Sequence, residues 1–492
     1  MAGGMKRLAR ETAVYGLSSI IGRFLNWLLV PVYTRTLAGT EEFGIYTNLY
    51  AWVALLLIIL TYGMETGFFR FVNKKEGTDG EEPVRVYATV LSCIGVTSLL
   101  FLLSAACFIH PLSRLLNYAE HPEYLAMMLS VVAIDAFCCI PFAYLRYKRR
   151  PLRFMLIKLL GIFLNIALNI FFLIVCPWLH AKTPGIIDSF YLPDYKVGYI
   201  FVANVITSVV TLLALTPDIL PALGHKPDFH LLKRILRYSF PILILGIAGI
   251  LNQTADKILF PSLFADKEYA NAQLGIYGAC FRMAAVMVMF IQAFRYAYEP
   301  FIFAGNRNAK AYSEAMKYFI IFALLIFLVV TFYLDWLKYF VTPAYYPGLS
   351  VVPVVMLGEL FFGIYFNLSV WYKLSDQTQW GAYFSIAGCI ITVAIIIIFA
   401  PRYGYMACAW ASFICNLSMM IFSYAVGQKK FPIPYDLKSA FIYFALAFIL
   451  YFAGVVPDIQ SEVLRLCYRT VLLIVFLILI VIKDFPYKPG KH

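Results

Sequence analysis

One stretch of the sequence decides the class of fold: Phe154-Met-Leu-Ile-Lys-Leu-Leu-Gly-Ile-Phe-Leu-Asn-Ile-Ala-Leu-Asn-Ile-Phe-Phe-Leu-Ile-Val-Cys176. It holds one charged residue, Lys158, and its apolar residues cover every face of a helix. At about 1.5 Å per residue, a helix of this length spans the ~30 Å hydrocarbon core of a bilayer. The stretch therefore predicts a transmembrane helix.

Similar runs fill the rest of the chain. Of its 492 residues, 62% are apolar and 14% are charged, whereas soluble globular proteins have about 45–50% and about 25%. The runs predict an all-α polytopic membrane protein of about fourteen spans, near residues 13–34, 43–69, 84–109, 123–146, 153–176, 197–217, 238–262, 274–303, 312–334, 348–372, 379–400, 402–426, 438–455 and 463–482. Little sequence remains for a soluble domain, which excludes a cytosolic enzyme, a nucleic-acid-binding protein and a secreted disulfide scaffold.

The basic residues are divided unequally between the two sides of these spans. With the N-terminus inside, 26 of the 40 Lys and Arg residues lie on the inner side and 9 on the outer side. Because cytoplasmic loops are enriched in Lys and Arg, both termini are predicted to be cytoplasmic. The densest basic run, Arg146–Arg153, is predicted to contact anionic membrane lipids, and the net charge of +13 implies no nucleic-acid partner.

Short sequence echoes indicate an internal repeat. Leu25-Asn26 and Phe43-Gly-Ile-Tyr46 return as Leu251-Asn252 and Leu274-Gly-Ile-Tyr277, at offsets of 226 and 231 residues. Two further echoes, at Tyr147-Lys148 and Gly198-Tyr199, keep the same order and fall on equivalent spans. Six spans per repeat is an even number, which predicts two parallel six-helix lobes around a central cavity, an arrangement found in transporters. We place the lobes at 1–220 and 221–430, with two extra helices and the tail at 431–492.

Signatures of catalysis are missing from the sequence. It has no phosphate-binding G-x-x-x-x-G-K-[ST] loop and no Cys/His spacing typical of a metal site. The longest outward loop, near 177–196, offers the acids Asp188 and Asp194 but is too short for a catalytic domain. The sequence thus favours a secondary transporter without a cofactor or metal, with Na⁺ or H⁺ as a possible coupling ion.

Basic residues inside the spans are the candidate substrate-binding groups. A charge at mid-bilayer costs roughly 2.5–3.5 kcal/mol on insertion scales, so it needs a cavity or a partner. Arg23 is near the middle of the first span, on a polar stripe with Gly16, Ser19 and Asn26, and Arg282 lies about 12 Å from the outer end of its span. Contact with cargo and a buried ion pair both explain such residues. The candidates are Arg23, Asn26, Lys257, Arg282 and Arg295.

Acidic residues inside the spans are the candidate ion-coupling groups. Asp135 and Glu359 are each close to the middle of a span, on helices that are equivalent in the repeat. A buried carboxylate can carry a proton or bind a cation. Asp256 and Glu65 are weaker candidates, because Asp256 adjoins Lys257 and Glu65 lies near the inner end of its span.

Several motifs resemble one known family. The segments Tyr15–Asn26, Pro31–Leu37, Glu42–Tyr46, Met64–Phe71, Ala255–Lys257, Leu274–Tyr277 and Tyr403–Tyr405 are similar to those of Wzx-type polysaccharide flippases. These belong to the multidrug/oligosaccharidyl-lipid/polysaccharide exporter superfamily, together with multidrug and toxin extrusion transporters and lipid II flippases. The resemblance covers nearly the whole chain.

The resemblance implies a function and a location. The protein would be an alternating-access carrier that moves an undecaprenyl-pyrophosphate-linked oligosaccharide across a bacterial inner membrane for assembly of a surface polysaccharide such as O-antigen, lipopolysaccharide or capsule. Members of this kind have a cationic cavity, which Arg23 and Arg282 would match, and guanidinium groups suit a pyrophosphate. Transient contact with polysaccharide polymerase machinery would follow.

Two other classes stay open on the sequence. A cation-coupled multidrug exporter of the same superfamily would use acids and aromatic residues in its cavity, which Asp135 and Glu359 could supply. A membrane glycan polymerase or ligase would be an enzyme, and the short outward loops count against it.

Overall fold

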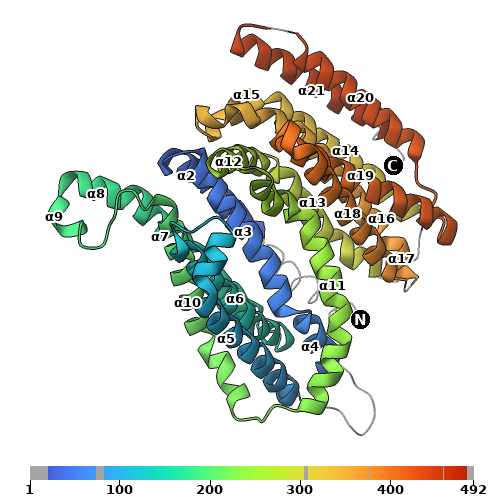
Figure 1. The fold of residues 1–492 in the computed structure, drawn as a ribbon. Coiled ribbons are helices and arrows are strands. Elements are labelled where there is room, and N and C mark those ends of the chain that lie inside the picture. The colour runs from blue at the N-terminus through green and yellow to red at the C-terminus, as the bar shows by residue number, and fades with distance from the viewer. Residues whose placement is uncertain (1–19, 74–82, 304–308, 376, 458, 485–492) are drawn as a thin grey trace. The chain divides into compact units, whose positions relative to one another are not determined.

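The computed structural model describes residues 20–73, 83–303, 309–375, 377–457 and 459–484, and every regular element in these ranges is a helix (Figure 1). The all-α class is therefore confirmed. The Gly16 and Ser19 part of the predicted polar stripe lies outside the described residues, as does most of the 73–85 loop.

The predicted spans from residue 43 onward each have a counterpart. They are α3 (Thr40–Thr61) with α4 (Met64–Val72), α5 (Pro83–Leu115), α6 (Pro122–Tyr147), α7 (Pro151–Ile170) continued by η2 (Phe171–Val175) and α8 (Cys176–Lys182), α10 (Lys196–Leu223), α11 (Phe229–Leu259), α12 (Lys267–Met283) with α13 (Ala285–Phe303), α14 (Ala309–Phe332), α16 (Val351–Leu368) with α17 (Val370–Leu374), α18 (Gln379–Tyr403), α19 (Tyr405–Lys430), α20 (Leu437–Val455) and α21 (Glu462–Asp484).

The number of spans is close to the expectation. Within the described ranges, 12 helices are long and apolar enough to cross a membrane, and 13 if α12 and α13, which meet at a 45° bend, are one span. The remaining predicted span, near 13–34, falls partly outside the described residues, where residues 20–27 and α2 (Val30–Thr36) are helical. The count of fourteen stays a prediction.

The chain divides into two compact units. Unit 1 comprises Met1–Gly278 and Thr392–Tyr405, and unit 2 comprises Ala279–Ile391 and Met406–His492. The predicted division into lobes at 1–220 and 221–430, followed by two extra helices and the tail at 431–492, stays a prediction. The packing divides the chain later than residue 220, because α11 packs along α3 and α4 in unit 1.

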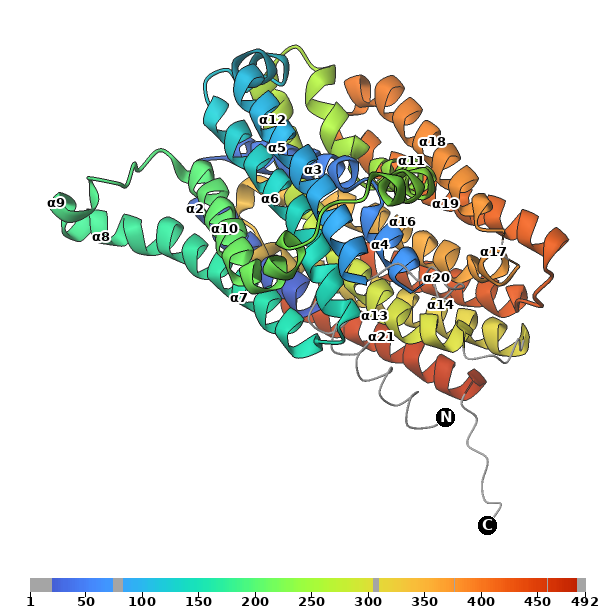
Figure 2. The same ribbon diagram turned by 90° about the horizontal axis from the view of Figure 1, so that it is seen from below.

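Unit 1 is built around α6, which packs against α3, α5 and α10 (Figure 2). Its core includes a ring stack between Tyr87 of α5 and Tyr144 of α6, with the ring centres 4.0 Å apart. Phe68 of α4 is fully buried in the same cluster. Buried on several sides, α6 is nearly continuously apolar, and an isolated charge such as Asp135 within it needs local partners.

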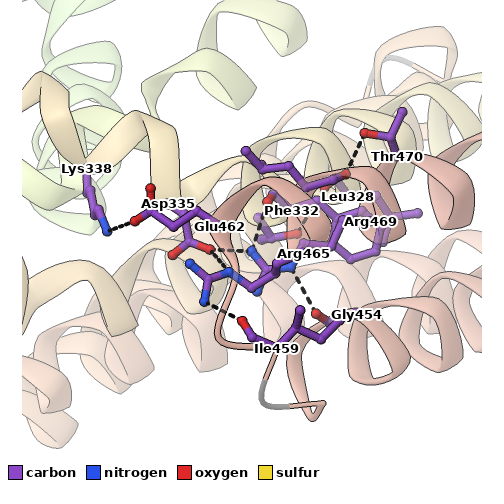
Figure 3. A network of polar contacts seen from close by, with 12 residues as sticks. Leu328, Phe332, Asp335, Lys338, Gly454, Ile459, Glu462, Arg465, Arg469 and Thr470 are labelled. Atoms are coloured by element: carbon purple, nitrogen blue, oxygen red, sulfur yellow. Dashed lines mark hydrogen bonds and ion pairs between the residues drawn. The ribbon is translucent and has the colours of Figure 1, made fainter.

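Unit 2 is built around α14, which packs against α16, α20 and α21. Ion pairs near both ends tie α21 to its neighbours. At its C-terminal end, Lys317 Nζ of α14 lies 2.5 Å from Asp484 Oδ1. At its N-terminal end, Arg465 and Arg469 contact Asp335 of the short helix α15 (Leu334–Leu337), as Figure 3 shows. The last helix is therefore fixed to α14 and α15 near both ends.

Candidate transport site

A charged cluster lies at mid-span in unit 1. Asp135 of α6 accepts a hydrogen bond from Ser208 Oγ of α10 at 2.8 Å. Lys158 of α7 interacts electrostatically with Asp135, and its ammonium nitrogen lies 4.0 Å from the centre of the Phe142 ring. We call Asp135, Lys158 and Ser208 the Asp135 cluster. It combines an acid and a base from different helices with a neutral hydroxyl donor, so its net charge can change by one proton.

Glu65 does not stand alone. It forms an ion pair with Arg146, which joins α4 to the end of α6. The Arg146 guanidinium also lies 5.1 Å from the centre of the Phe69 ring. Because Arg146 and Glu65 both interact electrostatically with Lys158, this pair is linked to the Asp135 cluster.

The basic run at 146–153 has a mixed role. Arg153 Nη2 lies 2.9 Å from Oδ2 of the buried Asp218 of α10, while Lys148, Arg149 and Arg150 are exposed. Contact with membrane lipids is therefore open to the three exposed residues, whereas Arg146 and Arg153 join helices within unit 1.

Asp256 and Lys257 belong to a polar network between α3, α11 and α12. Lys257 Nζ lies 2.8 Å from Asp256 Oδ2, and the Tyr277 hydroxyl donates to the same oxygen at 2.6 Å. Asn48 of α3 donates from Nδ2 to the Lys257 carbonyl at 2.7 Å, and Tyr118 donates to Asn48 at 2.8 Å. Asp256 is 5% exposed. The network joins helices, and roles in cargo binding for Lys257 or ion coupling for Asp256 stay predictions.

The remaining predicted residues are divided between the units. Arg23 and Asn26 have exposed side chains in unit 1. Arg282, next to the bend between α12 and α13, and Glu359, in the middle of α16, are half-buried in unit 2. Arg295 of α13 lies 4.9 Å above the Phe366 ring. The convergence of Arg23 and Arg282 on one cargo stays a prediction.

Sequence reasoning missed the partners of Asp135. Lys158 lies close to one end of its predicted span, from which a lysine can extend to the interface. Ser208 carried no signal, since a lone serine in an apolar run is common. The sequence offered one signal for this helix: the polar residues Thr207 and Ser208 lie three and four positions after Asn204 in the apolar run of α10. In the described ranges no group of three or more His, Cys, Asp and Glu side chains is placed to hold a metal ion.

Comparison with solved structures identifies the fold. The lipid II flippase MurJ, in an inward closed conformation, superposes with a TM-score of 0.73 at 13% identity, covering 95% of this chain and 99% of that chain. A multidrug resistance MATE family transporter, in an inward-facing conformation, gives 0.65 at 17% identity, covering 83% and 94%. The chain therefore shares its fold with these two solved membrane transporters, and its apolar helices make it a multi-pass membrane protein.

The family follows from the sequence. A model of the polysaccharide biosynthesis protein family matches residues 8–304, and the chain belongs to that family. No curated protein sequence matches it significantly. The resemblance to Wzx-type flippases of the multidrug/oligosaccharidyl-lipid/polysaccharide exporter superfamily is confirmed at the level of family and fold.

Proposed function

We propose that this protein is an alternating-access flippase for a polyprenyl-pyrophosphate-linked oligosaccharide, acting in a bacterial inner membrane during assembly of a surface polysaccharide. One observation carries the proposal: a member of a polysaccharide biosynthesis family has a fold that a lipid II flippase shares over 95% of the chain. A lipid-linked glycan fits both facts, because it is a polysaccharide precursor built on a lipid carrier.

Fixed positive charge suits this cargo. A pyrophosphate that leaves water for a low-dielectric cavity needs cations, and guanidinium groups bind its oxygens in pairs. Arg23 supplies an exposed guanidinium within an apolar segment, and Arg282 is the second guanidinium candidate. Asn26, Lys257 and Arg295 are the further candidates for contact with the diphosphate or the first sugar.

Drug export is the second candidate, and the structure offers less for it. A cationic drug needs an uncompensated acid, whereas Asp135 has Lys158 as an electrostatic neighbour. The drug transporter also matches a smaller share of this chain, 83% against 95%. An enzyme is disfavoured as well, because Asp188 in the loop near 177–196 is hydrogen-bonded to His180 at 2.6 Å rather than to Asp194. We therefore propose a secondary transporter.

Coupling is assigned to the acids inside the spans. Asp135 is the first choice, because it combines a mid-span position with a basic neighbour that can hold the charge when a proton leaves. Glu359 holds the corresponding place in unit 2. Either H⁺ or Na⁺ would suit a carboxylate with hydroxyl neighbours.

The topology of the proposal has both termini in the cytoplasm, with membrane lipids around the spans and transient contact with polymerase machinery on the outer side. A cysteine introduced into the 73–85 loop should react with an impermeant maleimide only after the cells are permeabilised. Reaction in intact spheroplasts would reverse the orientation.

Arg23 provides the decisive test of the cargo. In cells that lack their own flippase, Arg23→Ala should abolish export of lipid-linked glycan per unit of membrane protein, and Arg23→Lys should retain part of it, because charge remains but the paired geometry is lost. The exposed Arg114 of α5 provides the matched control, since Arg114→Ala should export normally. Normal export by a well-expressed Arg23→Ala variant would contradict the proposal.

A further inference from the structure

The two segments of the sequence echo, Phe43–Tyr46 and Leu274–Tyr277, contact each other in unit 1. Gly44 of α3 and Gly275 of α12 are equivalent in the repeat, and both are buried. A Cβ atom added to Gly44 would lie 1.9 Å from the carbonyl oxygen of Asn271, and one added to Gly275 would lie 1.7 Å from that of Thr40. Each glycine thus contacts the residue that lies four positions before the other glycine in the sequence.

This reciprocity continues one turn further along. A Cβ on Gly278 would lie 2.4 Å from Thr47 Oγ1, and the 231-residue offset of the echo makes these two positions equivalent as well. Equivalent residues of two helices meet where a local two-fold axis passes between them. Helices α3 and α12 therefore cross at these glycines, at equivalent positions of the predicted repeat.

The crossing has no room for a side chain. The atoms that an added Cβ would meet at Gly44 and Gly275 are backbone atoms, which cannot move aside without moving a helix. Small residues permit this approach of two backbones, and packing of this kind holds helices together in membranes. The predicted orientation places the first turns of α3 and α12 at the outer face.

An opposing force lies at the same end. Glu41 in the first turn of α3 and Glu268 in the first turn of α12 interact through their carboxyl groups, by charge and by a hydrogen bond. Two carboxyl groups share a hydrogen bond when one holds a proton, and they repel when both are ionised. Glycine packing favours an arrangement in which the two helices touch, and repulsion between the acids favours one in which they are apart.

We propose that the α3–α12 crossing is the outer gate of the transport pathway, closed in this structure by the Gly44–Gly275 contact and opened when the two helices separate. The proposal rests on the proposed function for the direction of transport. Its elements are specific: Gly275, Gly44 and Gly278 permit closure, while Glu41 and Glu268 favour opening when both are ionised.

Labelling of a buried reporter tests the gate without any cargo. Thr47 is 6% exposed beneath the crossing, so a Thr47→Cys protein should react slowly with an impermeant maleimide added outside, followed by mass spectrometry of the peptide that contains residue 47. Adding Gly275→Ala should raise the labelling rate about tenfold, because the added methyl group holds the helices apart. Adding Glu268→Gln should lower the rate, because the repulsion is gone.

Gly249→Ala on α11 is the matched control, because a Cβ there meets nothing within 4 Å, and it should leave the labelling rate unchanged. Since Glu268→Gln adds no bulk at the crossing, it tests the gate even where Gly275→Ala reduces the amount of protein. Labelling that neither variant changes would overturn the gate. Labelling that responds as expected, in a protein that exports no lipid-linked glycan, would instead overturn the proposed function and leave the gate standing.

Discussion

Asp135 and Asp335 are both acids beside basic side chains, but their surroundings differ. Asp335 Oδ2 accepts a hydrogen bond from Arg469 Nη1 at 2.7 Å and forms an ion pair with Arg465 Nε at 2.8 Å. Arg469 also donates to the carbonyls of Phe332 and Gly454 (Figure 3). Asp135 has one neutral donor, Ser208, and the more distant charge of Lys158.

The difference distinguishes a charge that holds helices together from one that can exchange a proton or a cation. The guanidinium of Arg469 bonds to an acid and two backbone carbonyls, so changing its charge state or position would leave several buried groups unpaired. The carboxylate of Asp135 can exchange a proton or a cation while keeping its serine partner. Loss of Asp135 should therefore affect transport, and loss of Asp335 should affect stability.

The largest expected effect is on transport by Asp135→Asn. The amide keeps the size of the side chain and its bond to Ser208 but cannot take up or release a proton. We expect gradient-driven transport in proteoliposomes to fall to background while the amount and thermal stability of the protein stay near wild type. Asp194→Asn, in the exposed loop near 177–196, is the control. Full transport by the Asp135→Asn, Glu359→Gln double variant would remove both acids from the mechanism.

The second effect is on stability, through Asp335→Asn. Two arginines would lose their shared acid, and leaving the buried guanidinium of Arg469 without a carboxylate costs roughly 3 kcal/mol. Thermal unfolding in detergent should show the loss, and the little protein that remains folded should transport at a normal rate per molecule. Glu120→Gln, at an exposed site, should change neither quantity. A stable but inactive Asp335→Asn protein would contradict the assignment of a structural role to Asp335 and a transport role to Asp135.

A smaller loss is expected at the other end of α21. Asp484 interacts with Lys317 and also accepts a hydrogen bond from the Tyr443 hydroxyl. Because Lys317→Met leaves the tyrosine in place, the free energy of unfolding should fall by about 1–2 kcal/mol. Limited proteolysis near the C-terminal end of α21 should report the loosened contact. A loss as large as that of Asp335→Asn would show that the two ends contribute equally.

The smallest effect concerns pH and a helix cap outside the spans. The pKa of Asp228 lies below its ordinary value of 3.8, because the backbone N–H groups of Leu231 and His230 donate to it and Arg85 lies nearby. Its stabilising effect is thus present above about pH 4 and lost as the pH falls through the lowered value. Asp228→Asn retains a capping side chain but should make the melting temperature less dependent on pH between about pH 6 and about pH 3. An unchanged pH profile would show that the cap is not coupled to unfolding.

Much of the fold was determined by the sequence itself. The predicted spans at 438–455 and 463–482 correspond to α20 (Leu437–Val455) and α21 (Glu462–Asp484), because the bilayer requires an apolar run of fixed length wherever a helix crosses it. The start of α11 was missed: it begins at Phe229 rather than near 238, since Asp228 caps the helix before the apolar run begins. Capping depends on one side chain, which hydropathy does not register.

The repeat was also visible in the sequence, but its consequence was not. The echo at Gly44 and Gly275 indicated two related halves, whereas the contact between the two glycines appears only when α3 and α12 are packed. The same holds for Glu65 with Arg146 and for Asp135 with Ser208, which is 73 positions away. Hydropathy along the chain fixes which segments cross the membrane. The rotation of each helix about its axis, which tertiary packing alone sets, decides which side chains meet.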